Sequence, residues 1–315
     1  MTSSRLPLAR VAIPVLAGAI AMGSAGCAAG SPRGGAGSGR LATVASFYPL
    51  QLATAEIGGD HVSVLNLTKP GAEPHDLELT PRDVGAVSKA RVVVYEKGLQ
   101  PAVDEAVAQE APDRALDVSA AAALDLTFTP VESGEQHADA AGSVDPHFWL
   151  DPVRYSAVAQ AVADRLTSLD PAHRADYAAN AKAFRGRLAA LDRDVRTGLA
   201  HCASTSVVTS HNAFGYLAQR YGLTQVGITG LSPEAEPEPA KLAEVATYVK
   251  AHDVTTIYAE TLVSPAIADT VARETGATVA RLDPIEGLTD SSAGRDYFEV
   301  MRSNLATLRA GQGCS

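Results

Sequence analysis

The sequence predicts an α/β protein with two lobes, each built on a mainly parallel sheet flanked by helices, joined by a long rigid helix. Short runs rich in β-branched residues alternate with helical stretches, which is the pattern of parallel sheets covered by helices on both faces. A long amphipathic stretch divides these runs into two groups. The chain of 315 residues is also long enough for two domains of ordinary size.

The N-terminus has the features of a secretion signal. Two arginines flank the start of an apolar run, Val11 to Met22. The run is shorter than the roughly 20 apolar residues that span a bilayer, but it suits a signal-peptide core. Small residues directly before Cys27 resemble a bacterial lipobox. We therefore expect residues 1–26 to be a signal peptide and Cys27 to be lipidated, and ordinary secretion with a free Cys27 is the alternative.

The segment after this cysteine is small and glycine-rich, so residues 27–40 are expected to form a lipidated flexible tether on the outer face of the cytoplasmic membrane. Loss of the signal peptide removes two arginines and no acids, which takes the formal net charge from -10 to -12. Such a chain is a poor candidate for binding nucleic acid or an anionic membrane surface by charge. An acidic surface attracts cations without selectivity, so a selective cation binder needs a defined site.

Cys202 and Cys314 are the two cysteines that remain after Cys27 is set aside. Outside the cytoplasm such a pair is expected to form a disulfide, which would tie the C-terminus to the chain near Cys202. Closing a loop of this length is worth roughly 4 to 5 kcal/mol in the chain-entropy model. Two unpaired thiols are the alternative.

Strands and helix starts can be assigned in order along the chain. The predicted strands are Ala42–Phe47, Val62–Leu67, Arg91–Tyr95, Ser206–Thr209, Gln225–Thr229, Val254–Tyr258 and Ala277–Leu282. Helices are predicted to begin where a capping side chain precedes a proline, at Thr80-Pro81, Asp151-Pro152, Asp170-Pro171 and Ser264-Pro265. No internal repeat is evident in the sequence.

The clearest single element is a helix over residues 171–200. Its apolar residues recur at intervals of three and four and form one stripe, Tyr177, Ala181, Phe184, Leu188, Leu191, Val195 and Leu199. The helix either crosses between two domains as a rigid strut or lies on the surface of a single larger domain. The first interpretation sets the N-terminal lobe at residues 41–168, the linking helix at 169–200 and the C-terminal lobe at 201–315.

Three histidines stand in separate segments next to turn residues. They are His75 in GAEPHDLELTP, His147 in DPHFWLDP and His211 in TSHNAFGYL. Neutral imidazole is a common metal ligand, and three imidazoles with one carboxylate suit zinc, or manganese if oxygen ligands join them. The alternative is that each histidine lies in a loop and bonds to nearby backbone.

The candidate ligands fall at one kind of position. His75, His211, Glu260 and Asp283 each follow a predicted strand, and His147 lies just before a predicted helix. Ligands of open α/β sheets bind beyond the carboxyl ends of the strands. Two candidates come from the first half of the chain and three from the second. The expected site is therefore a metal centre in a cleft between two lobes.

These histidine motifs, together with ASFYPL and PEAEPEP, are similar to those of the solute-binding lipoproteins of zinc and manganese ABC transporters. The resemblance runs from about Thr43 to Leu308. It implies two α/β lobes joined by a long helix, and delivery of a divalent metal to a membrane permease. By motif position, the implied metal ligands are His75, His147, His211 and Asp283. It implies no ligand role for Glu260.

The choice of metal depends on the position of His211 in this resemblance. A histidine there is typical of zinc-type members, while a glutamate is more typical of manganese-type members. Nitrogen-rich sites also favour zinc over manganese in the general order of affinity. Zinc-type members often carry a long His-rich and acidic loop before the second ligand, whereas the matching segment here has only His137. We expect Zn²⁺ as the transported ligand, with Mn²⁺ as the alternative.

The sequence thus predicts an extracytoplasmic solute-binding protein, monomeric and not an enzyme, that captures Zn²⁺ for uptake by an ABC transporter permease. A secreted zinc-dependent hydrolase with Glu260 as its base is the alternative, although the chain has no H-E-x-x-H motif. A binder of metal chelates or other small solutes is a further alternative.

Other side chains are expected to have structural roles. Trp149 is expected to pack beside the site, with a plain core position as the alternative. Four histidines are expected at the surface or as capping residues, His61, His173, His201 and His252.

Overall fold

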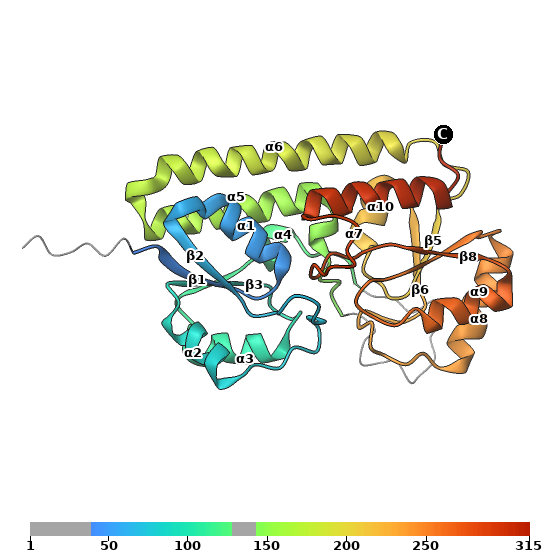
Figure 1. Ribbon diagram of the computed structural model, residues 1–315, viewed down its shortest axis with the longest axis horizontal. Helices are drawn as coiled ribbons and strands as arrows, with labels where there is room; N and C mark the ends of the chain where they lie inside the picture. The colour runs from blue at the N-terminus through green and yellow to red at the C-terminus, as the bar shows by residue number, and fades with distance from the viewer. Residues whose placement is uncertain (1–38, 128–142) are drawn as a thin grey trace, which may run out of the picture. The chain divides into compact units, whose positions relative to one another are not determined.

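Two parallel sheets of four strands each occupy the two halves of the chain in the computed structural model, which describes residues 39–127 and 143–315 (Figure 1). The predicted α/β fold class is confirmed. The predicted signal peptide, the predicted lipidation site Cys27, most of the predicted tether and His137 lie outside the described residues.

The first sheet has the strand order β2-β1-β3-β4, and all its pairings are parallel. Its strands are β1 Leu41–Ala45, β2 Val62–Asn66, β3 Val92–Tyr95 and β4 Ala115–Asp117. The accompanying helices are α1 Tyr48–Gly58, α2 Pro81–Lys89, α3 Pro101–Glu110 and α4 Ser119–Ala122, with a 3-10 turn at Gly59–His61. The three predicted strands are confirmed. The strand β4 was not predicted, and it is only three residues long and lies at the sheet edge.

The second sheet repeats this arrangement with the order β6-β5-β7-β8, again with parallel pairings. Its strands are β5 Ser206–Thr209, β6 Thr224–Gly227, β7 Thr256–Ala259 and β8 Thr278–Arg281. The helices around it are α7 Gly215–Tyr221, α8 Pro239–Ala251, α9 Ala266–Thr275 and α10 Tyr297–Gly311. The four predicted strands are confirmed, with ends that differ from the predicted ones by up to two residues.

The predicted helix starts are confirmed at two positions and shifted at two. Thr80 forms a capping box with Asp83 at the start of α2, and Asp151 accepts from the backbone of Val153 and Arg154 at the start of α5, Pro152–Leu169. After Asp170 the chain instead makes a 3-10 turn, Pro171–His173. The oxygen of Ser264 accepts from Ala266, where α9 begins.

The long predicted helix is α6, Arg174–Gly198. Its 25 residues extend for roughly 37 Å at 1.5 Å per residue. The buried stripe is the predicted one, Tyr177, Ala181, Phe184, Leu188, Leu191 and Val195. The helix packs along α5 and also contacts α1 and α10 (Figure 1). The predicted lobe boundaries on either side of it remain a prediction.

Each sheet packs one face against its own pair of helices and the other face against a core that both sheets share. The helices α2 and α3 cover one face of the first sheet, and α8 and α9 cover one face of the second. The opposite faces belong to one continuous apolar core, which includes Ala45 from the first sheet, Val207 from the second, and buried residues of α1, α5, α6, α7 and α10. The helical layer therefore holds the two sheets together, and it leaves their carboxyl ends facing the same region.

The C-terminus is fixed by a disulfide between Cys202 and Cys314, as predicted. This bond links the end of α10 to the segment that leads from α6 into β5. Among the described helices, none combines the length and apolar content that a membrane span requires.

Candidate metal centre

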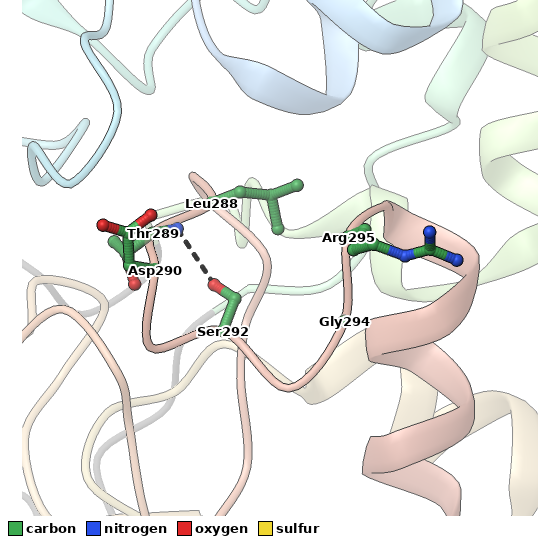
Figure 2. A pocket seen from close by; sticks show the side chains of 6 residues that line it. All are labelled: Leu288, Thr289, Asp290, Ser292, Gly294 and Arg295. Atoms are coloured by element: carbon green, nitrogen blue, oxygen red, sulfur yellow. Dashed lines mark hydrogen bonds between the residues drawn. The ribbon is translucent and has the colours of Figure 1, made fainter.

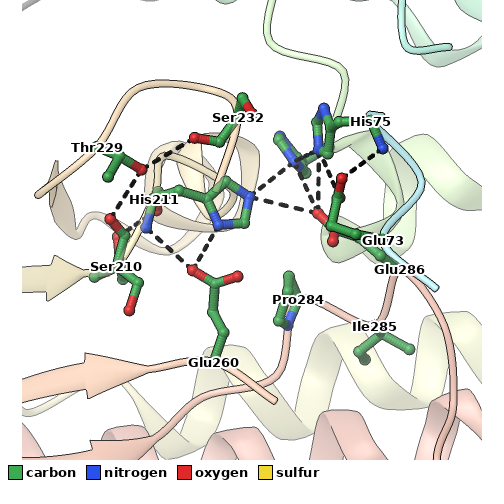
Figure 3. A network of polar contacts seen from close by, with 12 residues as sticks. Glu73, His75, Ser210, His211, Thr229, Ser232, Glu260, Pro284, Ile285 and Glu286 are labelled. Atoms are coloured by element: carbon green, nitrogen blue, oxygen red, sulfur yellow. Dashed lines mark hydrogen bonds and ion pairs between the residues drawn. The ribbon is translucent and has the colours of Figure 1, made fainter. Parts of the chain in front are cut away.

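The predicted histidines come from segments that meet beyond the carboxyl ends of both sheets. His75 lies between β2 and α2, and His147 directly precedes the 3-10 turn Phe148–Leu150 that leads into α5. His211 follows β5 after one intervening residue. All three lie close to Glu286, which lies in the segment between β8 and α10. Figure 3 shows His75 and His211 on opposite sides of this carboxylate group.

The four side chains form a tight cluster. One ligand atom from each of His75, His147, His211 and Glu286 lies within 4.8 Å of the others. The Oε1 atom of Glu286 is 3.4 Å from Nε2 of His75, 3.2 Å from Nε2 of His147 and 3.4 Å from Nε2 of His211. The Nε2 atom of His147 is 3.3 Å from each of the other two Nε2 atoms. Three imidazole nitrogens and one carboxylate oxygen are a donor set that suits tetrahedral zinc.

The structure does not bring Asp283 into this cluster. Its Oδ1 accepts from the backbone nitrogen of Ile285 at 2.8 Å, so the carboxylate is used within its own turn. The carboxylate that reaches the histidines belongs to Glu286, three residues further on. The expectation for the fourth ligand is corrected accordingly. Glu286 was not predicted, because Asp283 was chosen by its position directly after a predicted strand and by the motif resemblance.

Two of the histidines are held through their second ring nitrogen. The Nδ1 atom of His147 is 2.7 Å from Oδ1 of Asp145, and the Nδ1 atom of His211 is 2.6 Å from Oε1 of Glu260. The same carboxylate oxygens also accept from the backbone nitrogens of His147 and His211. A carboxylate on Nδ1 fixes the ring and leaves Nε2 to face a metal. Glu260 therefore orients the ring of His211. Asp145 orients the ring of His147 in the same way and was not predicted.

The electrostatics of the cluster follow from its burial and its carboxylates. Burial opposes protonation of His211, but the carboxylates of Glu260 and Glu286 outweigh burial and raise its pKa to about 10. Burial is likewise outweighed at His147, whose pKa is raised by Asp145 and Glu286. The pKa of His75 is lowered, because burial is the largest effect there. Burial would raise the pKa of Glu286, but its hydrogen bonds to the three imidazoles lower it well below the usual value. Without a metal, a proton on His211 therefore offsets part of the negative charge of the carboxylates at neutral pH.

A further carboxylate stands beside His75. The Oε2 atom of Glu73 accepts from the backbone nitrogens of His75 and Asp76, at 2.9 and 3.3 Å. Its Oε1 atom lies 4.0 Å from Nε2 of His75. Burial and the negative charge of Glu286 raise the pKa of Glu73 to about 7. Glu73 was not predicted as a site residue, although it lies two positions before His75.

Trp149 has both of the roles considered for it. Its side chain is fully buried, and its ring centre lies 5.2 Å from that of His147. Its Nε1 donates to the carbonyl of Pro284 at 2.7 Å, so the indole joins the His147 segment to the Glu286 segment.

The other predicted structural histidines lie outside the cluster. His61 is 2.9 Å from Asp176, and His173 is 2.5 Å from Asp170. The ring of His252 stacks on Tyr248. His201 is exposed and accepts from Ser315 through its carbonyl.

The loop that follows Glu286 forms an open pocket of about 530 Å³ (Figure 2). It is lined by Leu288, Thr289, Asp290, Ser292, Gly294 and Arg295. A hydrogen bond of 3.0 Å from the backbone nitrogen of Thr289 to Ser292 closes the turn. None of the four clustered side chains lines this pocket, so it is separate from the candidate metal centre.

Residues 43–311 match the model of the family described as zinc-uptake complex component A, periplasmic. The high-affinity zinc uptake system protein ZnuA of Bacillus subtilis is 35% identical over 297 residues, which is 90% of this chain and 92% of that protein. The zinc-binding lipoprotein AdcA of Streptococcus pneumoniae is 36% identical over 280 residues, or 86% of this chain. The chain spans only 56% of the length of AdcA.

Solved structures agree with these relatives. The Zn(II)-bound ZnuA-like domain of Streptococcus pneumoniae AdcA is 34% identical and aligns with a TM-score of 0.71 over 87% of this chain and 99% of that one. A mutant of the laminin-binding adhesin Lmb of Streptococcus agalactiae is 35% identical, with a TM-score of 0.74 over 86% of this chain and 99% of that one. The chain therefore belongs to the family of zinc-uptake complex component A, the periplasmic component.

Proposed function

We propose that this protein captures Zn²⁺ outside the cytoplasm and delivers it to the permease of an ABC transporter for uptake. The observation that carries this proposal is the convergence of His75, His147, His211 and Glu286 within 4.8 Å. The first two come from the first half of the chain and the last two from the second half. A metal bound there joins segments of both halves, which suits an ion that is captured and later released.

The donor set supports zinc over manganese. Three imidazole nitrogens dominate the site, and manganese prefers oxygen ligands. The third position is a histidine, His211, and its ring is oriented by Glu260. The relatives named for zinc agree with this choice. A site with three nitrogen ligands and one oxygen ligand therefore favours zinc over manganese.

The geometry does not favour a hydrolase. A catalytic zinc keeps an open position for water, whereas Glu286 supplies a fourth protein ligand here. Glu260 was the candidate base, but its Oε1 accepts from His211. A carboxylate occupied in this way orients a ligand and does not face a substrate.

We also propose that a lipid anchor holds the protein at the membrane. Cys27 would carry the lipid, residues 27–40 would form the tether, and the folded part would act as a monomer next to the permease. Replacing Cys27 with Ser should release the protein into the medium and leave zinc binding intact. A variant that stays with the membrane fraction would contradict the anchor but not the metal site.

The metal site is tested by elemental analysis of residues 41–315 purified without chelators, followed by a zinc–manganese competition titration. One zinc per chain and a clear preference for zinc are expected. His147→Ala should lose most of the zinc affinity, while the matched variant His252→Ala should keep it, because His252 lies outside the cluster. Equal affinities in the two variants would contradict the site.

A further inference from the structure

The segment that presents Glu286 adopts an unusual backbone conformation. Ile285 has a φ of 58°, in the left-handed region that β-branched residues avoid. It is one of three residues other than glycine with positive φ in the described chain, and it directly precedes the carboxylate that joins the histidine cluster. Figure 3 shows Ile285 pointing away from the imidazoles while Glu286 points toward them. The left-handed residue thus turns the chain so that Glu286 faces the metal ligands.

Such a conformation persists only when its surroundings enforce it. Asp283 does so from inside the turn, because its Oδ1 accepts from the backbone nitrogen of Ile285 at 2.8 Å. Trp149 does so from the His147 segment, because its Nε1 donates to the carbonyl of Pro284 at 2.7 Å. The side chain of Ile285 is fully buried in the core. The two hydrogen bonds thus act on neighbouring residues of the turn, Pro284 and Ile285.

Asp283 is itself fixed to α10. The Oδ1 atom of Asn304 accepts from the backbone nitrogen of Asp283 at 3.0 Å, and its Nδ2 donates to the carbonyl of Asp283 at 2.7 Å. Both Asp283 and Asn304 are buried, with exposed fractions of 3% each. A side-chain amide that bonds both polar groups of one residue substitutes for a neighbouring strand. The turn before Glu286 is therefore anchored to a helix and not only to its own loop.

We infer that Asp283 and Asn304 are positioning residues for the metal, acting through the left-handed turn at Ile285 that aims Glu286. This inference rests on the proposed zinc site. It gives Asp283 a role in which its oxygen acts as a hydrogen-bond acceptor, so its negative charge is not required. Asparagine keeps that acceptor, whereas alanine removes it.

The test compares Asp283→Asn with Asp283→Ala by zinc titration and by the electronic spectrum of the Co²⁺-substituted protein. Losing a residue that orients a ligand costs about tenfold to a hundredfold in metal affinity. We expect this loss in Asp283→Ala, with a changed Co²⁺ spectrum, and wild-type affinity and spectrum in Asp283→Asn. Glu286→Gln should lose affinity and change the spectrum as Asp283→Ala does.

Leu308→Ala is the control, because Leu308 is buried in α10, as Asn304 is, but its side chain forms no hydrogen bond with the turn. It should lower the stability of the fold and leave the zinc affinity and the Co²⁺ spectrum of the folded protein unchanged. Wild-type affinity in Asp283→Ala would overturn the inference, and so would equal losses in Asp283→Asn and Asp283→Ala. A wild-type protein that bound no zinc would overturn the proposed function itself, and with it this role.

Discussion

The carboxyl edges of the two sheets are built alike, and the first edge shows the pattern without a metal ligand. Ser46 follows β1, and its backbone nitrogen donates to the carbonyl of Val94 in β3 at 3.0 Å. Its carbonyl accepts from the backbone nitrogen and from Oγ1 of Thr68, at 3.2 and 2.8 Å. Glu96 comes directly after β3.

The second edge repeats each of these contacts. Ser210 follows β5 and donates to the carbonyl of Tyr258 in β7 at 3.0 Å. Its carbonyl accepts from the backbone nitrogen and from Oγ1 of Thr229, at 2.8 and 3.2 Å. Glu260 comes directly after β7. Serine, threonine and glutamate thus stand at matching positions in two halves that show no evident repeat in sequence.

The difference lies in the residue after the serine. His211 stands there in the second half, and its ring and backbone nitrogen meet Glu260. Phe47 stands there in the first half, and its ring packs against Trp149 at 4.8 Å. Glu96 is buried, and neither of its carboxylate oxygens has a hydrogen-bond partner among the described residues. One side chain therefore decides which edge becomes a ligand position and which carboxylate remains unused.

The first half supplies its ligand in another way. His75 lies on the long segment between β2 and α2, which Gln100 holds by donating to Thr68 and to the carbonyl of Pro74. The Nδ1 atom of His75 makes no hydrogen bond with the described residues, in contrast to Nδ1 of His211. His75 is thus positioned by a loop, while His211 is positioned by a sheet edge and a carboxylate.

The largest effects are expected when the residue after the serine, Phe47 in the first half or His211 in the second, is replaced by alanine. Phe47→Ala removes a fully buried ring and should lower the free energy of unfolding by about 3 to 5 kcal/mol, with zinc affinity retained by the folded protein. His211→Ala should instead lower zinc affinity by more than about a hundredfold. This loss exceeds the roughly tenfold to hundredfold loss expected when a residue that only orients a ligand is removed. Urea unfolding of the metal-free variants and a zinc competition titration measure the two effects. If both variants lost zinc equally, the two edges would not differ in the way described.

A second experiment compares the matching carboxylates. Glu260→Gln should weaken zinc binding by about tenfold to a hundredfold, because the His211 ring loses the charged acceptor on its Nδ1. Glu96→Gln should leave zinc affinity unchanged, because the Glu96 carboxylate makes no hydrogen bond with a histidine of the cluster. Isothermal titration with a competing chelator resolves this range. A loss of affinity in Glu96→Gln would mean that the first edge also serves the metal.

The pH dependence of zinc binding follows from the protons that the metal must displace. The pKa of His211, raised to about 10, means that this imidazole of the metal-free site holds a proton at neutral pH, and the pKa of His147 is raised as well. Zinc affinity should therefore rise with pH from about 6.5 towards 10, by about tenfold per pH unit for each proton released. Calorimetry at pH 7.5 in buffers of different protonation enthalpy counts these protons. Fewer protons should be released in Glu260→Gln. A zinc affinity that is constant from pH 6.5 to 9 would contradict the displacement of protons by the metal.

The smallest effect concerns stability without metal. Burial, with the negative charges of Asp145, Asp117 and Asp104, raises the pKa of Glu96 well above 4.5. Between the unfolded and folded pKa values the folded state holds a proton that the unfolded state has released, so stability falls as pH rises above about 4.5. Glu96→Gln should remove this loss, so the variant should be more stable than the wild type at pH 8, with little difference at pH 4.5.

Urea unfolding of the metal-free proteins at the two pH values measures this difference. The exposed Glu105 offers a control, since Glu105→Gln should change stability equally at both. A Glu96→Gln variant that is less stable than the wild type at pH 8 would show that the carboxylate has a charged partner.

Much of the fold follows from local sequence. Seven of the eight strands are evident as short β-branched runs, and the α6 stripe from Tyr177 to Val195 is evident from its spacing. The strand β4 could not be found in this way, because a three-residue edge strand carries too few side chains to show a pattern. The 3-10 turn Pro171–His173 has the Asp-Pro pair of a helix start, but the Asp170 carboxylate contacts His173 and Tyr177 and does not cap the backbone.

What the sequence alone determined is the set of three histidines, because each stands beside turn residues at an element boundary and all strand ends of a parallel sheet share one edge. The fourth ligand depended on tertiary structure. Asp283 and Glu286 are equally good carboxylates in the sequence, and the choice depends on the left-handed backbone of Ile285, which Asn304 and Trp149 enforce from distant parts of the chain. The same holds for Glu96 and Glu260. Folding places His211 beside Glu260, whereas the oxygens of Glu96 have no hydrogen-bond partner among the described residues. Local patterns report where a backbone turns, whereas the direction of a single side chain is decided by contacts between residues far apart in sequence.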